Sequence, residues 1–398
     1  MWKNKNVWIL LSGEFIAGLG LWLGIIGNLE FMQEKVPSDF MKSLILASGL
    51  LAGLAVGPYA GKLIDRMKKK TVMLAAGFIR VVSVVFMLIA INTGSVLWMV
   101  VFLMVIQLSA AFYFPALQAA IPMVVKGKEL LQMNGVHMNV STLSRILGTA
   151  LGGVLLVIMP LYMLYILSLL AYAILFGLTW FLSFQEEGAS TVAKGKAGGF
   201  KEVFPVLKNL PIVSMTLIMT LIPLLFIGGF NLMVINISEI QDSTAIKGWI
   251  YTAEGLSFMI GAFAVKRIGE KISPYRILFT FSFIIGIAQL VLYFAGNPIL
   301  SVLSFIIFGF AVGCFFPTAA TIFQTRMPKD YHGRFFSFRN MLDRMAFQVV
   351  LLMTGLLLDL VGLPVMTVLF GGFSLIMTTI FYVRFKALQE EKTQEINV

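Results

Sequence analysis

The chain has 398 residues, of which 59% are hydrophobic and only 12% are charged. Soluble globular proteins carry about 45–50% apolar and about 25% charged residues, so this composition excludes an array of soluble domains. A helix that crosses a bilayer needs about 20 apolar residues, and with its connecting turn it uses ~30–35 residues of chain. The length therefore corresponds to about a dozen crossings, and the mean hydropathy of +0.92 indicates a polytopic integral membrane protein.

Twelve apolar segments follow one another along the chain and predict an all-α integral membrane protein with twelve transmembrane helices. They lie at 7–33, 41–60, 72–92, 96–119, 134–158, 161–184, 211–237, 245–266, 277–296, 298–322, 336–359 and 364–385. The first segment follows Lys3 and Lys5 and lacks a small-residue cleavage site. We therefore expect it to be a retained crossing and not a removable signal peptide.

Positively charged residues concentrate in alternate connections between these segments. The connection after the second segment contains the run Lys68-Lys69-Lys70, whereas the opposite side carries only Lys35, Lys42 and Lys247. By the positive-inside rule, this asymmetry predicts that both termini lie in the cytoplasm. The expected location is a bacterial-type cell (cytoplasmic) membrane. A basic face against anionic lipid headgroups then explains the net charge of +11 without a nucleic-acid partner.

The two halves of the chain resemble each other in order and spacing. Phe114-Pro115-Ala116 recurs as Phe316-Pro317-Thr318, and Leu143-Ser144-Arg145 recurs as Leu342-Asp343-Arg344. A parallel repeat of six helices implies two bundles related by an axis along the membrane normal. We expect an N-terminal six-helix bundle at 1–184, a cytoplasmic linker at 185–210, a C-terminal six-helix bundle at 211–386 and a cytoplasmic tail at 387–398.

The connection after the second segment contains Gly61, Asp65 and Arg66, followed by the three lysines. It resembles the Gly-x-x-x-Asp-Arg-x-Gly-Arg-Arg motif of the major facilitator superfamily, with Lys68 in place of the second glycine. The resemblance implies the major facilitator fold. It also implies that Asp65 faces the N-terminal end of the eleventh helix, where the helix dipole favours an anion. The expected conformational latch consists of Gly61, Asp65, Arg66, Arg339, Asp343 and Arg344.

The fifth segment resembles the antiporter motif of the same superfamily. Ser144 replaces one glycine of that motif and Thr149 replaces its proline. The stretches 114–122 and 331–337 are similar to the macrolide-efflux type of drug:proton antiporter. The resemblance covers the whole chain in order. The glycines that carry the antiporter-like motif are Gly135, Gly148, Gly152 and Gly153.

Glu14, Arg145 and Glu254 lie deep in apolar segments. Each would cost roughly 3 kcal/mol at the bilayer centre if it faced lipid, so we expect all three to line a cavity. A carboxylate in such surroundings can load and release protons, and a nearby cation alters that balance. We predict proton coupling at these three residues. Structural pairing with polar neighbours is the alternative. The predicted substrate cavity consists of Glu14, Asn28, Gln107, Arg145, Asn231 and Glu254.

Two further charged residues have simpler expected roles. Arg80 lies two turns into the third segment, and we expect its long side chain to reach the cytoplasmic surface. Glu30 lies near the outer end of the first segment and is expected to be interfacial.

Several kinds of chemistry find no machinery in the sequence. The single cysteine, Cys314, excludes an internal disulfide, and the two histidines, His137 and His332, lack a metal-ligand spacing. The sequence contains neither a Walker-type phosphate loop nor a Gly-x-Ser-x-Gly elbow. We therefore expect no enzymatic activity, no cofactor and no bound metal.

The sequence favours a monomeric secondary transporter that exports hydrophobic or cationic amphipathic compounds in exchange for protons. Its expected partners are a small amphipathic substrate, protons and membrane lipids. Soft apolar walls from the 23 methionines and 35 phenylalanines suit bulky substrates better than sugars. A lipid flippase, or a metabolite uniporter or symporter of the same fold, is the alternative.

Overall fold

The computed structural model describes residues 1–125, 128–184, 203–328 and 332–396, and within these residues it contains helices and no strands. The chain divides into two compact units. Unit 1 comprises Met1–Ala193 together with Ser243–Thr252, and unit 2 comprises Lys194–Asp242 together with Ala253–Val398. Most of the expected linker, 185–202, lies outside the described residues.

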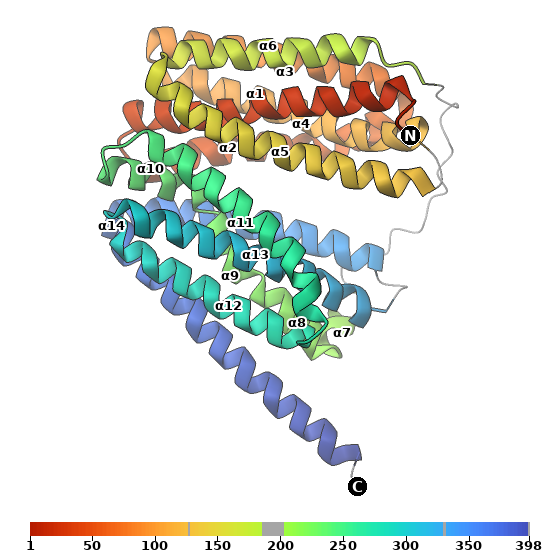
Figure 1. Cartoon of the computed structure of the whole chain (residues 1–398), viewed down its shortest axis with the longest axis vertical. Coiled ribbons are helices and arrows are strands. Elements are labelled where there is room, and N and C mark those ends of the chain that lie inside the picture. Colours follow the sequence, from red (N-terminus) through yellow and green to blue (C-terminus); the bar gives the residue numbers. More distant parts are fainter. Residues whose placement is uncertain (126–127, 185–202, 329–331, 397–398) are drawn as a thin grey trace. The chain divides into compact units, whose positions relative to one another are not determined.

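Unit 1 contains the six long helices α1 to α6, which form a compact bundle (Figure 1). The helices are α1 Lys5–Lys35, α2 Asp39–Arg66, α3 Lys69–Thr93, α4 Val96–Val124, α5 Lys128–Ile158 and α6 Leu161–Trp180. Helix α1 packs against both α5 and α6, α3 packs against α4 and α6, and α2 packs against α4. The long apolar sequences form helices because, in a membrane, a helix satisfies all of its own backbone hydrogen bonds.

The helix ends in unit 1 follow ordinary capping chemistry. Asn4 and Ser38 accept hydrogen bonds from the backbone N–H groups of Asn6 and Met41, at the beginnings of α1 and α2. Gly94 ends α3 with a φ of 65°, a conformation that a residue with a side chain rarely adopts. These caps permit the short connections that the sequence predicts between successive crossings.

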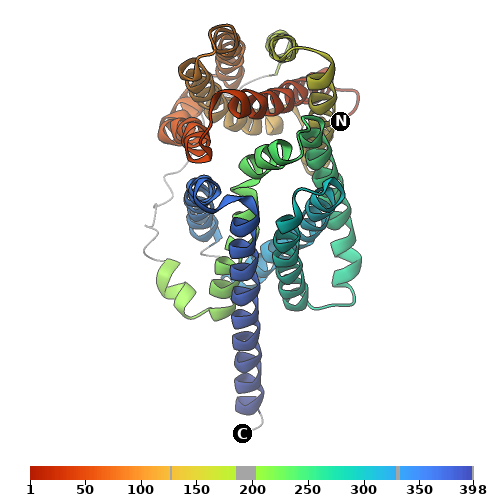
Figure 2. The ribbon, with the colours of Figure 1, turned by 90° about the vertical axis from the view of Figure 1, so that its left-hand side faces the viewer.

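Unit 2 contains the remaining helices, which Figure 2 shows after a quarter turn. They are α7 Val203–Lys208, α8 Pro211–Met219, α9 Leu221–Ile227, α10 Phe230–Ile240, α11 Ala245–Gly269, α12 Pro274–Val291, η2 Leu292–Phe294, α13 Pro298–Arg326 and α14 His332–Ile396. Helix α12 packs against α13 and α14, and α9 packs against α14. The first eight residues of α11 belong to unit 1.

Two predicted segments differ in form from the observed helices. The segment 211–237 is expected as one helix, but it is interrupted at Thr220 and at Gly228-Gly229. Both glycines lie tightly against Val350 and Thr354 of α14, where a larger residue would collide. The segments 336–359 and 364–385 are continuous within α14, apart from Gly362 (φ 75°, ψ 169°).

The crossings number twelve. Ten stretches of the described residues are long and apolar enough to span a membrane, and one of these, Phe338–Ala387, contains two helices joined at Gly362. Helix α11, with 25 residues, supplies the twelfth crossing and carries Lys247 and Glu254 along its length. The structure therefore confirms the all-α class. The expected tail at 387–398 is helical as far as Ile396.

The repeat is visible in how equivalent helices approach each other. In unit 1, Gly49 and Gly53 of α2 lie against Leu103 and Gln107 of α4. In unit 2, Gly261 of α11 lies against α13, and the glycines of α13 lie against the backbone of α11. Small residues permit such close helix contacts in membranes. Both halves thus use glycine to join their second and fourth crossings.

Candidate functional site

The core of unit 1 brings together an acidic side chain of α1 and a basic side chain of α5. Glu14 is the tenth residue of α1, and His137 is the tenth residue of α5. The His137 Nε2 lies 3.8 Å from the Glu14 Oε2, and both residues are buried, with exposed fractions of 9% and 8%. The Nε2 atom has no hydrogen-bond partner in the described structure. The two groups are therefore placed for an ion pair that forms only when the imidazole is protonated.

Glycines hold α1 and α5 in this register. A Cβ atom on Gly18 of α1 would overlap the hydroxyl of Ser144, and one on Gly148 of α5 would lie 2.8 Å from Trp22. Gly152 is similarly tight against Ile26. Two glycines of the antiporter-like motif, Gly148 and Gly152, thus serve the contact with α1. The surroundings of Gly135 lie outside the described part of the chain.

Arg145 lies at a different level from Glu14. Its guanidinium is 5.9 Å from the ring centre of Trp22, and that ring makes an edge contact with Tyr251 of α11. Trp22 and Arg145 are each eight residues beyond Glu14 and His137, which corresponds to ~12 Å along a helix. Of His137 and Arg145, His137 is the one for which the structure gives a contact with Glu14.

Arg80 of α3 is enclosed by aromatic rings. Its guanidinium lies 5.0 Å from the ring centre of Tyr113, 5.5 Å from that of Phe114 and 5.4 Å from that of Tyr172. Only 4% of the residue is exposed, so the expectation that Arg80 reaches the surface is wrong. The rings stabilise the cation through their negative faces, which replaces the solvation that snorkelling would provide. Arg80 is a fixed internal positive charge.

Asn28 and Gln107 complete the predicted cavity residues of unit 1. The Tyr165 hydroxyl of α6 donates a hydrogen bond to the Asn28 Oδ1 at 2.5 Å, and it lies 3.0 Å from the Gly24 carbonyl. Asn28 is buried in this contact between α1 and α6. Gln107 is half-buried, and its backbone packs against Gly53. The structure thus gives Asn28 a packing partner, and its cavity role stays a prediction.

The other predicted cavity residues lie in unit 2. Glu254 of α11 is 7% exposed, and its backbone carbonyl is in tight contact with Gly309 of α13. Asn231 is half-buried and follows directly after the interruption at Gly228-Gly229. Each unit therefore contains one deeply buried glutamate in a membrane-spanning helix.

The predicted latch is described only in part. Gly61, Asp65 and Arg66 lie at the end of α2, but their side-chain surroundings lie outside the described structure. Near the beginning of α14, the Arg339 Nε lies 3.3 Å from the Asp343 Oδ2, and its guanidinium stacks 4.7 Å from the Phe323 ring centre. Arg344 is exposed. The roles of all six residues stay predictions.

At the far end of α1, Glu30 is more than an interfacial residue. The Lys247 Nζ lies 2.5 Å from the Glu30 Oε2, and Lys247 is completely buried. Beside this ion pair, Gly153 of α5 meets Gly248 so closely that a Cβ atom on Gly153 would lie 2.7 Å from the Gly248 Cα. Gly153, the last glycine of the antiporter-like motif, therefore holds the first turns of α11. Glu30 and Lys247 carry opposite charges and lie on the same sparsely charged side of the predicted membrane protein. That was the sequence signal from which their ion pair could have been predicted.

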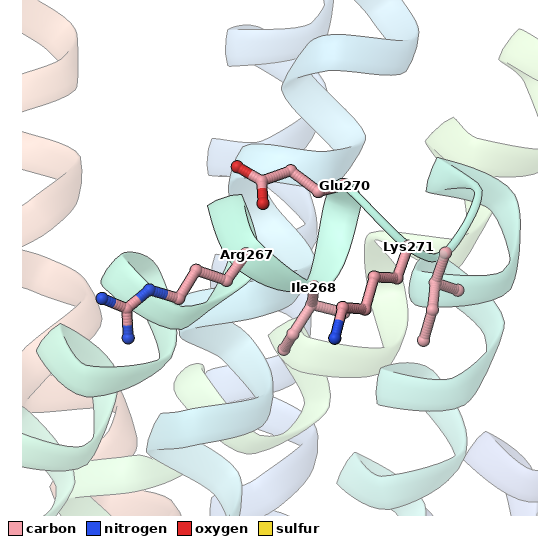
Figure 3. A pocket seen from close by; sticks show the side chains of 5 residues that line it. Arg267, Ile268, Glu270 and Lys271 are labelled. Carbon is pink, nitrogen blue, oxygen red and sulfur yellow. The ribbon is translucent and has the colours of Figure 1, made fainter.

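An open pocket of about 490 Å³ lies at the end of α11 and the following turn (Figure 3). Arg267, Glu270 and Lys271 line it with Ile268 and Ile272, and their charged ends point in different directions. A ligand site needs convergent polar groups in a concave apolar setting. This pocket lacks that convergence, so the candidate site remains the buried charges.

Comparison with known proteins identifies the family. The sequence model of the Major Facilitator Superfamily matches residues 10–239 and 216–397. Macrolide efflux protein A of Streptococcus pyogenes is 23% identical over 385 residues, covering 91% of each chain. The multi-drug resistance efflux pump PmrA of Streptococcus pneumoniae serotype 4 is 24% identical over 349 residues, covering 85% of each.

Among solved structures, a crystal structure of a variant of the nucleoside transporter NupG superposes with a TM-score of 0.81. The superposition covers 96% of this chain and 100% of the other, at 12% sequence identity, and so it reports on the fold alone. Since the family model spans the chain from residue 10 to residue 397 and the twelve-helix fold agrees with it, this protein belongs to the Major Facilitator Superfamily of membrane transporters.

Proposed function

We propose that the protein is a secondary active exporter of hydrophobic or cationic amphipathic compounds and is driven by protons that flow inward. The observation that carries this proposal is the presence of a buried glutamate in each unit, Glu14 and Glu254, within membrane-spanning helices. Buried intramembrane carboxylates are costly and mark ion or proton pathways. The efflux proteins among its relatives support the direction of transport.

The energetics are sufficient without ATP. One proton that moves across 100 mV supplies about 2.3 kcal/mol, and tenfold accumulation of a neutral compound costs about 1.4 kcal/mol. For a neutral substrate, a single proton per cycle can therefore sustain a useful gradient. Alternating access requires that proton and substrate favour different conformations, so that each changes the affinity for the other.

Reconstitution in liposomes that enclose a pH-sensitive dye tests this function. With a lipophilic cation such as tetraphenylphosphonium, an imposed proton gradient should drive uphill movement of the cation, and the cation gradient should drive protons the opposite way. Protein-free liposomes are the control. Movement of both in the same direction would indicate a symporter, and cation movement without protons would indicate a uniporter.

The two glutamates have a predicted phenotype. Glu254→Gln and Glu14→Gln each resemble a permanently protonated carboxyl, so each variant should lose proton-driven accumulation by at least tenfold. Glu239→Gln, at the end of α10, is the matched control and should retain accumulation. If both buried variants build gradients with the pH dependence of the original protein, neither carboxylate couples protons.

The lipid flippase remains the second candidate, because the relatives' names do not specify a substrate class for this chain. Fluorescent phospholipid in the same liposomes distinguishes it. Protein-dependent exposure of the lipid to an impermeant quencher, with no response to the lipophilic cation, would favour the flippase.

A further inference from the structure

We propose that Glu14 and His137 form a single proton-binding site, in which the imidazole carries the exchangeable proton and the carboxylate carries the compensating charge. The inference rests on the proposed proton-coupled function. It assigns the proton to a pair that joins α1 and α5, in place of an isolated carboxylate regulated by Arg145.

The geometry fits a site that has released its proton. The Nε2 and Oε2 atoms are 3.8 Å apart, whereas hydrogen bonds between nitrogen and oxygen span about 2.7–3.2 Å. When Nε2 carries no proton, its lone pair faces the lone pairs of the carboxylate, and nothing draws the atoms together. Protonation at Nε2 would make that nitrogen a donor and create a charge-assisted bond. The partnerless Nε2, in a residue more than nine-tenths buried, marks the position of the proton.

The described side chains around this pair have other roles. Helix α3 contributes Arg80, which keeps its charge at any physiological pH. Tyr113 of α4 interacts electrostatically with both Arg80 and Glu14, and Tyr172 of α6 interacts with Arg80. Phenols are neutral near pH 7. Among the described residues of this cluster, Glu14 and His137 are thus the acid and the base that lie in direct contact.

The pair also provides a rule of exclusion. While the imidazolium is present, it neutralises Glu14 and repels a cationic substrate. When the proton leaves to water, the carboxylate of Glu14 is uncompensated on that side and attracts a cation. Proton and cationic substrate therefore exclude each other at Glu14, which is the condition for exchange.

Nuclear magnetic resonance tests the pair without any substrate. The chain contains two histidines, so selective labelling gives two imidazole signals, and His332→Gln identifies the signal of His137. An opposite charge within ~4–6 Å moves a titration midpoint by about one to three pH units. Glu14→Gln should therefore change the pH dependence of the His137 signal, and Arg145→Gln should change it less.

Folding of the variants is checked by the unchanged signal of His332, and Glu14→Asp gives a second variant that retains the charge. Glu14→Asp should keep the His137 midpoint closer to the original than Glu14→Gln does. A His137 titration that is identical in the original protein and in Glu14→Gln would overturn the pair.

Transport separates this inference from the proposed function. His137→Gln should reduce the ratio of uphill to downhill tetraphenylphosphonium movement at least tenfold, whereas His332→Gln should leave it unchanged. If the original protein shows no proton-driven movement, the proposed function fails, while the titration still decides the pair. If the original protein and His137→Gln couple protons equally, the pair is overturned and the proposed function stands.

Discussion

At the scale of single residues, the close contact between α1 and α5 depends on glycines, which have no Cβ atom. The Cβ that Gly18 lacks would overlap the Ser144 hydroxyl, which donates a hydrogen bond to the Ser141 carbonyl at 2.8 Å. Ser144 occupies a position at which the antiporter-like motif has glycine. The chain therefore combines a larger residue on α5 with a glycine on α1, and this combination keeps Glu14 and His137 at the same level.

Gly18→Ala is expected to destabilise the protein by about 1–3 kcal/mol, because the added methyl group overpacks the helix contact. Adding Ser144→Gly should restore most of the loss, since it removes the overlapping atoms. Gly177→Ala in α6 is the matched control, because a Cβ there meets nothing within 4 Å. Thermal unfolding in detergent, followed by tryptophan fluorescence, measures all three. Equal midpoints for Gly18→Ala and Gly177→Ala would contradict the overlap.

The residue scale also shows where sequence reasoning reaches its limit. Burial of Glu14 and Glu254 could be predicted, because a charge in a long apolar helix must avoid lipid. The partner of Glu14 could not, since His137 and Arg145 lie on the same helix, and only the register of α5 against α1 selects between them. Likewise, the apolar sequence around Arg80 gave no indication that three rings from α4 and α6 would enclose it.

At the scale of helices, the beginning of α11 is held by one ion pair. Lys247 is the third residue of this helix, where the positive end of the helix dipole disfavours a cation. Complete burial removes water as a source of solvation, so the contact with Glu30 offsets both costs. The close approach of Gly153 and Gly248 fixes the helix at the same place.

Glu30→Gln should lower the midpoint of thermal unfolding by an amount that corresponds to about 2 kcal/mol, because it removes the charged partner of a buried ammonium. The further change Lys247→Met should recover part of that loss. Glu34→Gln is the control, since its ion pair with Lys35 is solvent-exposed and contributes little. If Glu30→Gln and Glu34→Gln behave alike, Lys247 does not depend on Glu30.

The helices themselves were largely predictable, and their interruptions were not. Continuous apolar sequence predicts that residues 211–237 cross the membrane, but it does not show that the helix is interrupted at Thr220 and at Gly228-Gly229, where the two glycines lie tightly against α14. The predicted turn between the last two crossings is reduced to Gly362, whose positive φ redirects a chain that otherwise stays helical.

At the scale of the whole molecule, the cation asymmetry predicts the orientation in the membrane. Cys314 is buried, and its thiol lies 3.3 Å from the Gly261 carbonyl. It is the single cysteine of the chain, so Cys314→Ser gives a background without native thiols. In that background, Asn209→Cys should react with impermeant thiol reagents only from the cytoplasmic side, and Glu34→Cys only from outside. Both positions are exposed. Labelling of Asn209→Cys from outside in sealed intact cells would show that the orientation is opposite to the predicted one.

The division of α11 has a consequence for how the protein is made. Unit 1 includes Ser243–Thr252, which the ribosome produces only after the six helices α1 to α6 and the following crossing. Until then, Glu30 lacks Lys247 and Gly153 lacks Gly248. The first six helices are therefore synthesised before all of their packing partners exist. A fragment that ends in the 185–210 segment should be degraded faster in cells than a fragment that continues through Thr252.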